Sequence, residues 1–236
     1  MKDNQTKIMI IESCFNVLAI RKERLTIDWI ENRMKIFMNY TLKSLKAQTN
    51  KNFLAFIQYD PKSKDIIETE IKKYEKLPAN VKFVTPEEFK KIVAEKIKNY
   101  DLLYMIRLDC DDMYHKTFIQ QLYDINPSKQ TKVIINQNGY IYDSVQNRIA
   151  KFFYTSPNYY TLIYDVDKYL GGERYELPGG HNYVINLPHE IIPKRNYIRH
   201  AHTHNDVTCF ERYNIKDKDI IKNEKMINEI LKDFME

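Results

Sequence analysis

The sequence predicts an α/β fold with a mostly parallel sheet flanked by helices, followed by a less regular C-terminal half. Within the first 110 residues, short apolar runs alternate with amphipathic stretches at close spacing. Strands connected in this way run parallel, with right-handed crossovers and helices on both faces of the sheet. Ligands bind at the carboxyl ends of the strands in such sheets, so polar residues that follow a strand are the candidates for function.

Four strands are predicted in this half, at residues 7–11, 53–59, 81–84 and 101–108. Between the first two, apolar residues recur in steps of three and four from residue 27 to 47, which predicts one amphipathic helix. Ser63 is predicted to cap a helix that reaches residue 77. Thr85-Pro86-Glu87-Glu88 combines a capping box with proline at the first helical position, which predicts a helix that reaches residue 98.

The second half shows a weaker pattern. Apolar runs at 132–136 and 140–142 flank Asn138-Gly139, a dipeptide typical of hairpin turns. A strand is predicted at 149–154, extended chain at 193–204 and a closing amphipathic helix at 217–234. The pairs Gly171-Gly172 and Gly179-Gly180 indicate loops. Neither a repeat nor a linker is evident, so we expect one domain over residues 1–236.

The composition favours an ordinary globular protein, with 43% hydrophobic and 29% charged residues. The net charge of +5 is modest and spread along the chain, which does not predict nucleic-acid binding. Three widely spaced cysteines without a CxxC pattern favour a reducing compartment. Because the N-terminus lacks signal-peptide features and no apolar run approaches ~20 residues, we expect a cytoplasmic protein with at most a peripheral contact to the inner membrane face.

The segment Arg107-Leu108-Asp109-Cys110-Asp111-Asp112, called the acid segment below, directly follows a predicted strand. Carboxylates this close repel one another unless a cation neutralises them. Mg²⁺ or Mn²⁺ prefers oxygen ligands and can also hold the oxygens of a diphosphate. The segment therefore favours a metal site, although acids at the start of a helix or in a solvated loop would give the same pattern. Arg107 can pair with the acids or hold a phosphate.

A second cluster lies near the end of the chain, where His200, His202 and His204 alternate. Alternate residues of an extended segment point to one face, a common layout for metal ligands, but a surface strand fits equally well. We favour His202 as a ligand, followed by His204. Glycine pairs let a backbone approach a ligand closely, so the loop at residues 179–182 is either part of a pocket or a plain turn. Neither a P-loop, a GxGxxG motif nor a GxSxG motif is present.

In order and spacing, these residues resemble the putative rhamnosyltransferases of the GT-A glycosyltransferase class. The resemblance covers most of the chain and is loosest between residues 140 and 193. It rests on four features, which are Trp29 and Arg33 followed by Phe37, the S-L-x-x-Q of residues 44–48, the R-L-D-x-D-D of the acid segment and the H-x-x-N of residues 202–205.

The resemblance implies a Rossmann-like GT-A domain that transfers a sugar from a nucleotide-diphospho-sugar, with Asp109 at the ribose or sugar. The donor-binding residues that the resemblance implies are Ser13, Phe15, Asn16, Asp60 and Asp109, and the sequence itself adds Arg107, Gly180 and His181 as candidates. The implied ligands of a Mn²⁺ or Mg²⁺ ion are Asp111, Asp112, His202 and His204. An inverting enzyme also needs one general base, for which the candidates are Asp165, Asp167, Glu173 and Glu176, whereas a retaining enzyme needs none.

The leading hypothesis is a metal-dependent glycosyltransferase for surface polysaccharide or glycan synthesis. The family name suggests rhamnose, and the acceptor would be a hydroxyl of a glycan or of a lipid-linked molecule. A sugar-phosphate nucleotidyltransferase is a second hypothesis, but residues 10–20 contain no glycine for a phosphate-binding loop. A non-catalytic scaffold with a structural cation is the third.

Overall fold

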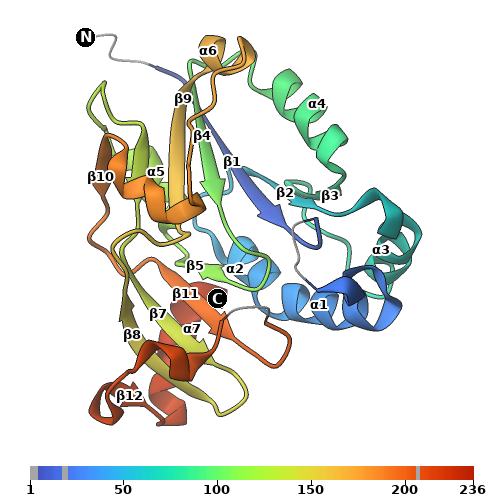
Figure 1. Ribbon diagram of the computed structural model, residues 1–236, viewed down its shortest axis with the longest axis vertical. Helices are drawn as coiled ribbons and strands as arrows, with labels where there is room; N and C mark the ends of the chain where they lie inside the picture. The colour runs from blue at the N-terminus through green and yellow to red at the C-terminus, as the bar shows by residue number, and fades with distance from the viewer. Residues whose placement is uncertain (1–4, 18–20, 206–207) are drawn as a thin grey trace.

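The computed structural model describes residues 5–17, 21–205 and 208–236, and its largest element is a seven-stranded sheet (Figure 1). From edge to edge, its strands are β10 (His189–Ile191), β6 (Val133–Ile135), β9 (Tyr160–Asp165), β4 (Leu102–Arg107), β1 (Lys7–Cys14), β2 (Leu54–Gln58) and β3 (Val81–Val84). The strands β4, β1, β2 and β3 run parallel, and β9 lies antiparallel between β4 and β6. The predicted fold class, a mostly parallel α/β sheet, is confirmed.

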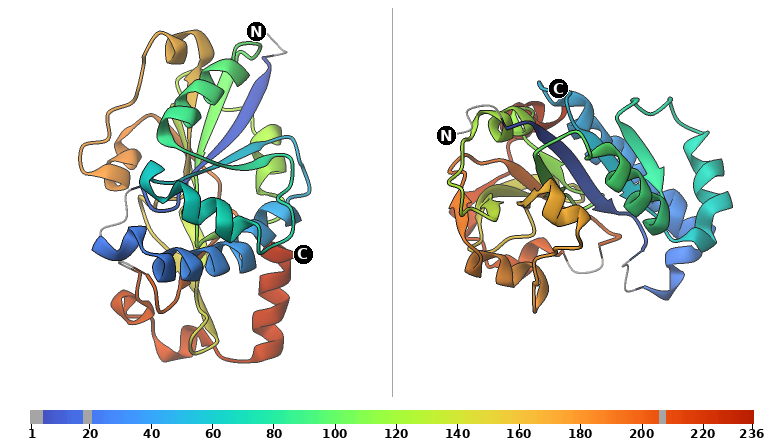
Figure 2. Two further views of the ribbon diagram at one scale, coloured as in Figure 1. Left: turned by 90° about the vertical axis from the view of Figure 1, so that its right-hand side faces the viewer. Right: turned by 90° about the horizontal axis from the view of Figure 1, so that it is seen from above.

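Helices cover both faces of this sheet (Figure 2). Because side chains alternate along a strand, Met9 and Ile11 of β1 pack in the core with the first two helices, whereas Ile8 and Ile10 pack with α4. The helices are α1 (Ile27–Asn39), α2 (Thr41–Ala47), α3 (Lys64–Ile71), α4 (Pro86–Lys96), α5 (Phe118–Asp124), α6 (Val166–Leu170) and α7 (Glu224–Met235). Short 3₁₀ helices join several of them, at Lys22–Leu25, Pro61–Ser63, Gly180–Asn186, Phe210–Tyr213 and Asp217–Asp219.

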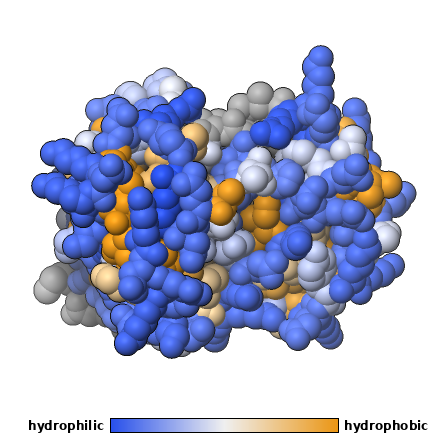
Figure 3. Space-filling view, turned by 90° about the horizontal axis from the view of Figure 1, so that it is seen from below, coloured by the Kyte–Doolittle hydropathy of each residue, from blue (hydrophilic) through white to orange (hydrophobic). Residues whose placement is uncertain are grey.

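A second, five-stranded sheet is built mainly from the C-terminal half. Its order is β12 (Ile220–Ile221), β8 (Arg148–Phe153), β7 (Asn138–Asp143), β11 (Tyr197–Ala201) and β5 (Met113–Tyr114). Helix α7 packs on it through Ile227, Leu231 and Phe234. Seen from the lower end of Figure 1, the surface is mostly hydrophilic, with apolar groups in separate patches (Figure 3). The acid segment joins the two sheets, because β4 belongs to the first and β5 to the second.

Several predicted boundaries were wrong. The helix expected over residues 27–47 is broken at Tyr40, where φ −124° and ψ −72° leave the helical region, so that α1 and α2 are separate. The helices expected to reach residues 77 and 98 end at Ile71 and Lys96, and the closing helix begins at Glu224. The capping box at Thr85 is confirmed.

The turn expected at Asn138-Gly139 was also wrong, because both residues belong to β7. The chain reverses between β7 and β8 instead, where Asn147 adopts a left-handed conformation with φ +46°. Gly139 serves close packing, since a Cβ built on it would lie 2.3 Å from the ring of Tyr197, its partner in the β7–β11 register. Tyr197 is fully buried and stacks on Tyr159 at 3.7 Å.

We therefore predict that Gly139→Ala lowers the free energy of unfolding by about 1–3 kcal/mol, because the added methyl group must displace a buried ring. Urea denaturation followed by circular dichroism measures this loss. Gly171→Ala is the control, since its Cβ would come no closer than 3.3 Å to another atom. An equal loss in both variants would contradict the packing role of Gly139.

Candidate functional site

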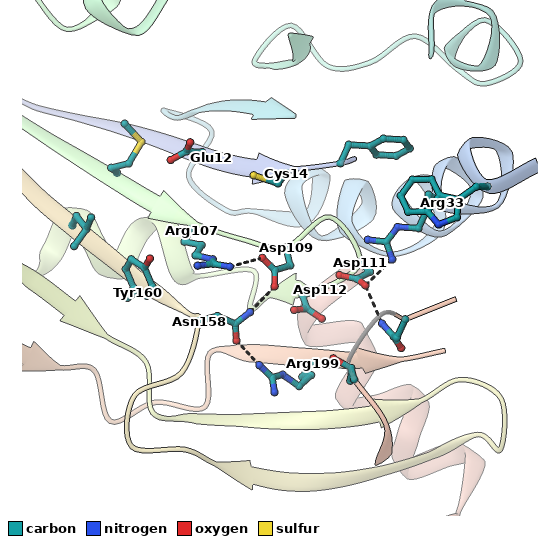
Figure 4. A pocket seen from close by; sticks show the side chains of 16 residues that line it. Glu12, Cys14, Arg33, Arg107, Asp109, Asp111, Asp112, Asn158, Tyr160 and Arg199 are labelled. Atoms are coloured by element: carbon teal, nitrogen blue, oxygen red, sulfur yellow. Dashed lines mark hydrogen bonds and ion pairs between the residues drawn. The ribbon is translucent and has the colours of Figure 1, made fainter. Parts of the chain in front are cut away.

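A cavity of about 440 Å³ lies at the carboxyl ends of β1 and β4, where the fold class places ligands (Figure 4). Its volume is within the range of small-molecule sites. Segments far apart in sequence line it, including the end of β1, the first half of α1, the acid segment, the start of β9 and the end of β11. We call it the donor pocket below, after the sugar donor that the family resemblance leads us to expect.

Three arginines line the donor pocket together with three aspartates and Glu12, so cationic groups offset most of its acidic charge. The arginines are Arg33, Arg107 and Arg199, and the aspartates are Asp109, Asp111 and Asp112. Carboxylates this close together need cations around them. In the structure, guanidinium groups from α1, β4 and β11 already neutralise much of this charge.

Asp111 receives its contacts on a single oxygen. Its Oδ2 atom lies 2.9 Å from Arg33 Nη1, 3.1 Å from His202 Nε2 and 3.0 Å from Asn205 Nδ2. Burial alone would raise the pKa of this carboxyl, but Arg33 and His202 outweigh it and hold the pKa well below its usual range. Asp111 is therefore a charged carboxylate at the wall of the pocket.

Asp112 is bonded through both oxygens. Oδ2 accepts from the Tyr159 hydroxyl at 2.6 Å, and Oδ1 accepts from the His200 backbone N–H at 2.8 Å. Burial, together with the charges of Asp111 and Asp109, raises the pKa of Asp112 well above its usual range. These contacts tie the acid segment to β11 and favour a structural role for Asp112.

Asp109 faces the pocket and is held from two sides. Asn158 Nδ2 donates to its Oδ2 atom at 2.7 Å, and Arg107 Nη2 lies 3.5 Å from its Oδ1 atom. Arg199 Nη2 donates to Asn158 Oδ1 at 2.5 Å and so fixes the amide. The Asp109 side chain remains 39% exposed, which leaves it able to accept from a ligand hydroxyl.

Glu12 and Cys14 form the β1 wall of the pocket, opposite Arg107 (Figure 4). Gln58 Nε2 donates to Glu12 Oε1 at 2.7 Å, while burial raises the pKa of Glu12. Burial also raises the pKa of Cys14 to about 12, so this thiol is a poor nucleophile. An acid at an alternate position of an apolar strand was the signal that could have identified Glu12.

Of the predicted donor-binding residues, Phe15, Arg107 and Asp109 line the pocket. Ser13 is buried, and its hydroxyl has no partner among the described residues. Asn16 holds the neighbouring chain instead, accepting from the Asp60 backbone N–H at 2.7 Å.

Asp60 pairs with Arg24 at 2.7 Å rather than reaching the cavity. Gly180 and His181 lie in a 3₁₀ segment that Ser156 anchors by donating to the His181 carbonyl at 2.6 Å. Neither residue is part of the pocket lining. Burial, followed by the charges of Arg107 and Arg199, lowers the pKa of His181.

The four base candidates do not line the pocket. Strand β9 is antiparallel to β4, so Asp165 pairs with Leu102 at the opposite end of β4 from the acid segment. Asp165 caps α6 by accepting from the backbone N–H of Asp167. Glu173 and Glu176 follow α6 and likewise are not part of the cavity wall.

Sequence reasoning missed several pocket residues. Trp29 and Arg33 both line the cavity, but the sequence singled them out only as part of the family resemblance. Asn158 and Arg199 carried no local signal, because their roles depend on contacts with residues far away in the chain, whereas Asn205 appeared only in the H-x-x-N of the resemblance.

Asp111 and His202 fit a divalent cation as two of its ligands. Adjacent donors around an octahedral ion with bonds of about 2.1 Å are about 3 Å apart, close to the 3.1 Å between Asp111 Oδ2 and His202 Nε2. His204 donates its backbone N–H to His202 Nδ1 at 3.1 Å, which orients Nε2 toward Asp111. Over residues 5–17, 21–205 and 208–236, no group of three or more His, Cys, Asp or Glu side chains is arranged to hold a metal.

A family model described as "Putative rhamnosyl transferase" matches residues 16–209. No curated protein matches the chain. Solved structures similar to it include TarS 1–349 from S. aureus in complex with UDP, with 12% identity and a TM-score of 0.45 over 83% of this chain and 60% of that one. The chain thus spans about three fifths of the TarS fragment.

Two further solved structures are similar at the same level. A cytidylyltransferase from Leptospira borgpetersenii has 12% identity and a TM-score of 0.41 over 82% of this chain and 78% of that one. HddC from Yersinia pseudotuberculosis has 11% identity and a TM-score of 0.42 over 82% of this chain and 90% of that one. No helix in the described part of the chain has the length and apolar character needed to span a membrane.

The His200 imidazole predicts a pH dependence of stability. Its ring is buried, donates from Nδ1 to the Asp111 carbonyl at 3.2 Å and accepts at Nε2 from Ser144 at 2.7 Å. Burial lowers its pKa from 6.5 to about 3, so the unfolded chain binds a proton more readily than the folded protein. The protein should therefore lose stability as the pH falls from about 6.5 toward 3.

Thermal melts at pH 7, 6, 5 and 4 test this prediction with His200→Asn, whose melting temperature should fall less over this range than that of the parent. His189→Asn is the control, since His189 is exposed. Parallel curves for the parent and His200→Asn would show that His200 does not cause the acid sensitivity.

Proposed function

We propose that this chain, which belongs to the putative rhamnosyl transferase family, is a GT-A-type glycosyltransferase that takes its sugar from a nucleotide-diphospho-sugar. The observation that carries the proposal is the donor pocket at the carboxyl ends of β1 and β4, where arginines and aspartates line one cavity. Arginine recognises phosphate oxygens, and aspartate accepts from sugar hydroxyls. A diphosphate linked to a sugar offers both kinds of group.

The pocket residues divide into two roles for such a donor. Asp109, oriented by Asn158 and partly exposed, would accept from a hydroxyl of the ribose or of the transferred sugar. Arg107 is also 39% exposed, and its guanidinium would bind a phosphate oxygen. Phe15 and Trp29 supply aromatic surface at the α1 end of the same cavity, which suits a nucleotide base.

A Mn²⁺ or Mg²⁺ ion would be held by Asp111 and His202, with the donor's phosphate oxygens as further ligands. When bound, it would neutralise the charge that develops on the departing nucleoside diphosphate. Asp112 and His204 would support this site indirectly, since Asp112 is bonded through both oxygens and His204 contacts His202 Nδ1. Rhamnose, from the family name, is the proposed donor sugar.

The proposed acceptor is a hydroxyl of a glycan or a lipid-linked glycan, as in surface polysaccharide synthesis. The proposed location is the cytoplasm, with at most a peripheral contact to the membrane. The whole reaction would replace the bond between the sugar and the diphosphate by a glycosidic bond. The nucleoside diphosphate would leave as the second product.

We predict that the parent protein binds one of UDP, dTDP, GDP or CDP more tightly with Mn²⁺ than without it. Asp111→Asn should weaken binding in the presence of Mn²⁺ at least about tenfold, because the amide is a much poorer metal ligand than the carboxylate. Isothermal titration calorimetry measures both affinities, and circular dichroism checks that the variant is folded.

The matched control is Asp65→Asn, which removes an exposed carboxylate from α3 and should bind like the parent. If the parent binds none of the four nucleotides, the proposed function is wrong. If Asp111→Asn binds like the parent, only the proposed metal ligand is wrong. Release of pyrophosphate from a nucleoside triphosphate and a sugar phosphate would instead indicate a nucleotidyltransferase.

A further inference from the structure

Arg33 is a buried cation beside the residues proposed to hold the metal. It extends from α1, and its side chain is only 11% exposed (Figure 4). Nη1 donates to Asp111 Oδ2 at 2.9 Å, and Nη2 donates to the Cys110 sulfur at 3.1 Å. The guanidinium therefore lies where it neutralises Asp111 directly.

This position satisfies Arg33 only in part. Its Nε atom is buried and has no hydrogen-bond partner among the described residues, and sulfur is a weak acceptor. By contrast, each of the three nitrogens of Arg199 donates to an oxygen, on Tyr159, Tyr213 and Asn158. A buried donor without a partner costs free energy, so the Arg33 site is less favourable than a site with oxygen acceptors would be.

Arg33 also contacts the same oxygen that a cation would need. His202 and Asn205 reach Oδ2 of Asp111 as well, so three donors already surround this atom. A divalent ion and the Arg33 guanidinium carry charge of the same sign and would compete for this oxygen. An ion that binds there must either tolerate Arg33 or displace it.

We propose that Arg33 is a displaceable counter-ion, which pairs with Asp111 in the absence of donor and turns onto the diphosphate when metal and donor bind. The inference rests on the proposed function, since it assumes that a diphosphate enters the donor pocket. Phosphate oxygens would give the guanidinium the oxygen acceptors that it lacks in the present position. The diphosphate then draws Arg33 away from the oxygen that the metal needs, and the metal at Asp111 frees Arg33 to bind the diphosphate. Metal and nucleotide therefore each raise the affinity of the protein for the other.

The test is Arg33→Gln, with Mn²⁺ alone as the first probe. Without the competing charge, the variant should bind Mn²⁺ about 5- to 100-fold more tightly than the parent, measured by electron paramagnetic resonance of free Mn²⁺. With Mn²⁺ saturating, it should bind the nucleotide that the parent prefers, among UDP, dTDP, GDP and CDP, about tenfold more weakly. The opposite signs of the two changes identify a displaceable counter-ion.

Two matched variants separate this role from simpler ones. Arg107→Gln removes a pocket arginine that does not contact Asp111, and it should weaken nucleotide binding while raising Mn²⁺ affinity much less than Arg33→Gln does. Arg33→Lys keeps the charge but not the planar fork, so it should bind Mn²⁺ as weakly as the parent and also bind the nucleotide more weakly. Because it keeps Asp111 paired, it also tests the proposal if Arg33→Gln fails to fold.

The proposal is overturned if Arg33→Gln or Arg33→Lys binds the nucleotide as tightly as the parent does. It is also overturned if Arg33→Gln binds Mn²⁺ no more tightly than the parent does. A further contradicting result would be that Arg33→Lys binds Mn²⁺ as tightly as is expected for Arg33→Gln. A parent that binds no nucleotide at all would instead refute the proposed function. The two failures therefore give different results.

Discussion

The balance of charge between the acid segment and three arginines is the constraint on which the site depends. Asp109, Asp111 and Asp112 lie within four residues, and carboxylates so close together are stable only when donors and cations surround them. Those partners come from three distant parts of the chain. They are Arg33 on α1, Asn158 and Tyr159 before β9, and Arg199, His200 and His202 on or directly after β11. The donor pocket exists because these elements must converge on one short segment.

The same constraint explains how the two sheets are joined. The acid segment leaves β4 in the first sheet and enters β5 in the second, and α2 supports its backbone. Thr41 donates to the Asp112 carbonyl at 2.9 Å, Ser44 to the Tyr114 carbonyl at 2.9 Å, and Gln48 to the His115 carbonyl at 3.0 Å. The S-L-x-x-Q pattern therefore has a structural reason, because Ser44 and Gln48 lie on the helix face that meets β5. The break at Tyr40 separates this helix from α1, which carries Arg33.

The sequence was sufficient to predict the parallel strands and the position of the acid segment at a strand end, because apolar periodicity and the carboxyl-end rule depend on local residues. It was not sufficient for Asn158 or Arg199, whose partners are set by the folded chain. The base candidates near Asp165 lie away from the pocket because β9 runs antiparallel to β4 and ends at the other end of the sheet. Asn138-Gly139 misled in a similar way, because the glycine makes room for Tyr197 rather than for a turn.

The charge balance also bears on how a ligand would enter. In the pocket, the positive charges of the arginines already offset the negative charges of the aspartates. A diphosphate that enters adds negative charge, and uncompensated charge is unfavourable in a buried site. Glu12 lines the same pocket and would add to this cost when ionised. A cation that enters with the diphosphate would offset the added charge. Arg199 would keep its three oxygen acceptors, and Asp112 would keep its two hydrogen-bond donors. Among the three pocket arginines, only Arg33 has both a buried nitrogen without a partner in the described part of the chain and a direct contact to Asp111. Arg33 is therefore the side chain that would have to move when a cation and a diphosphate bind.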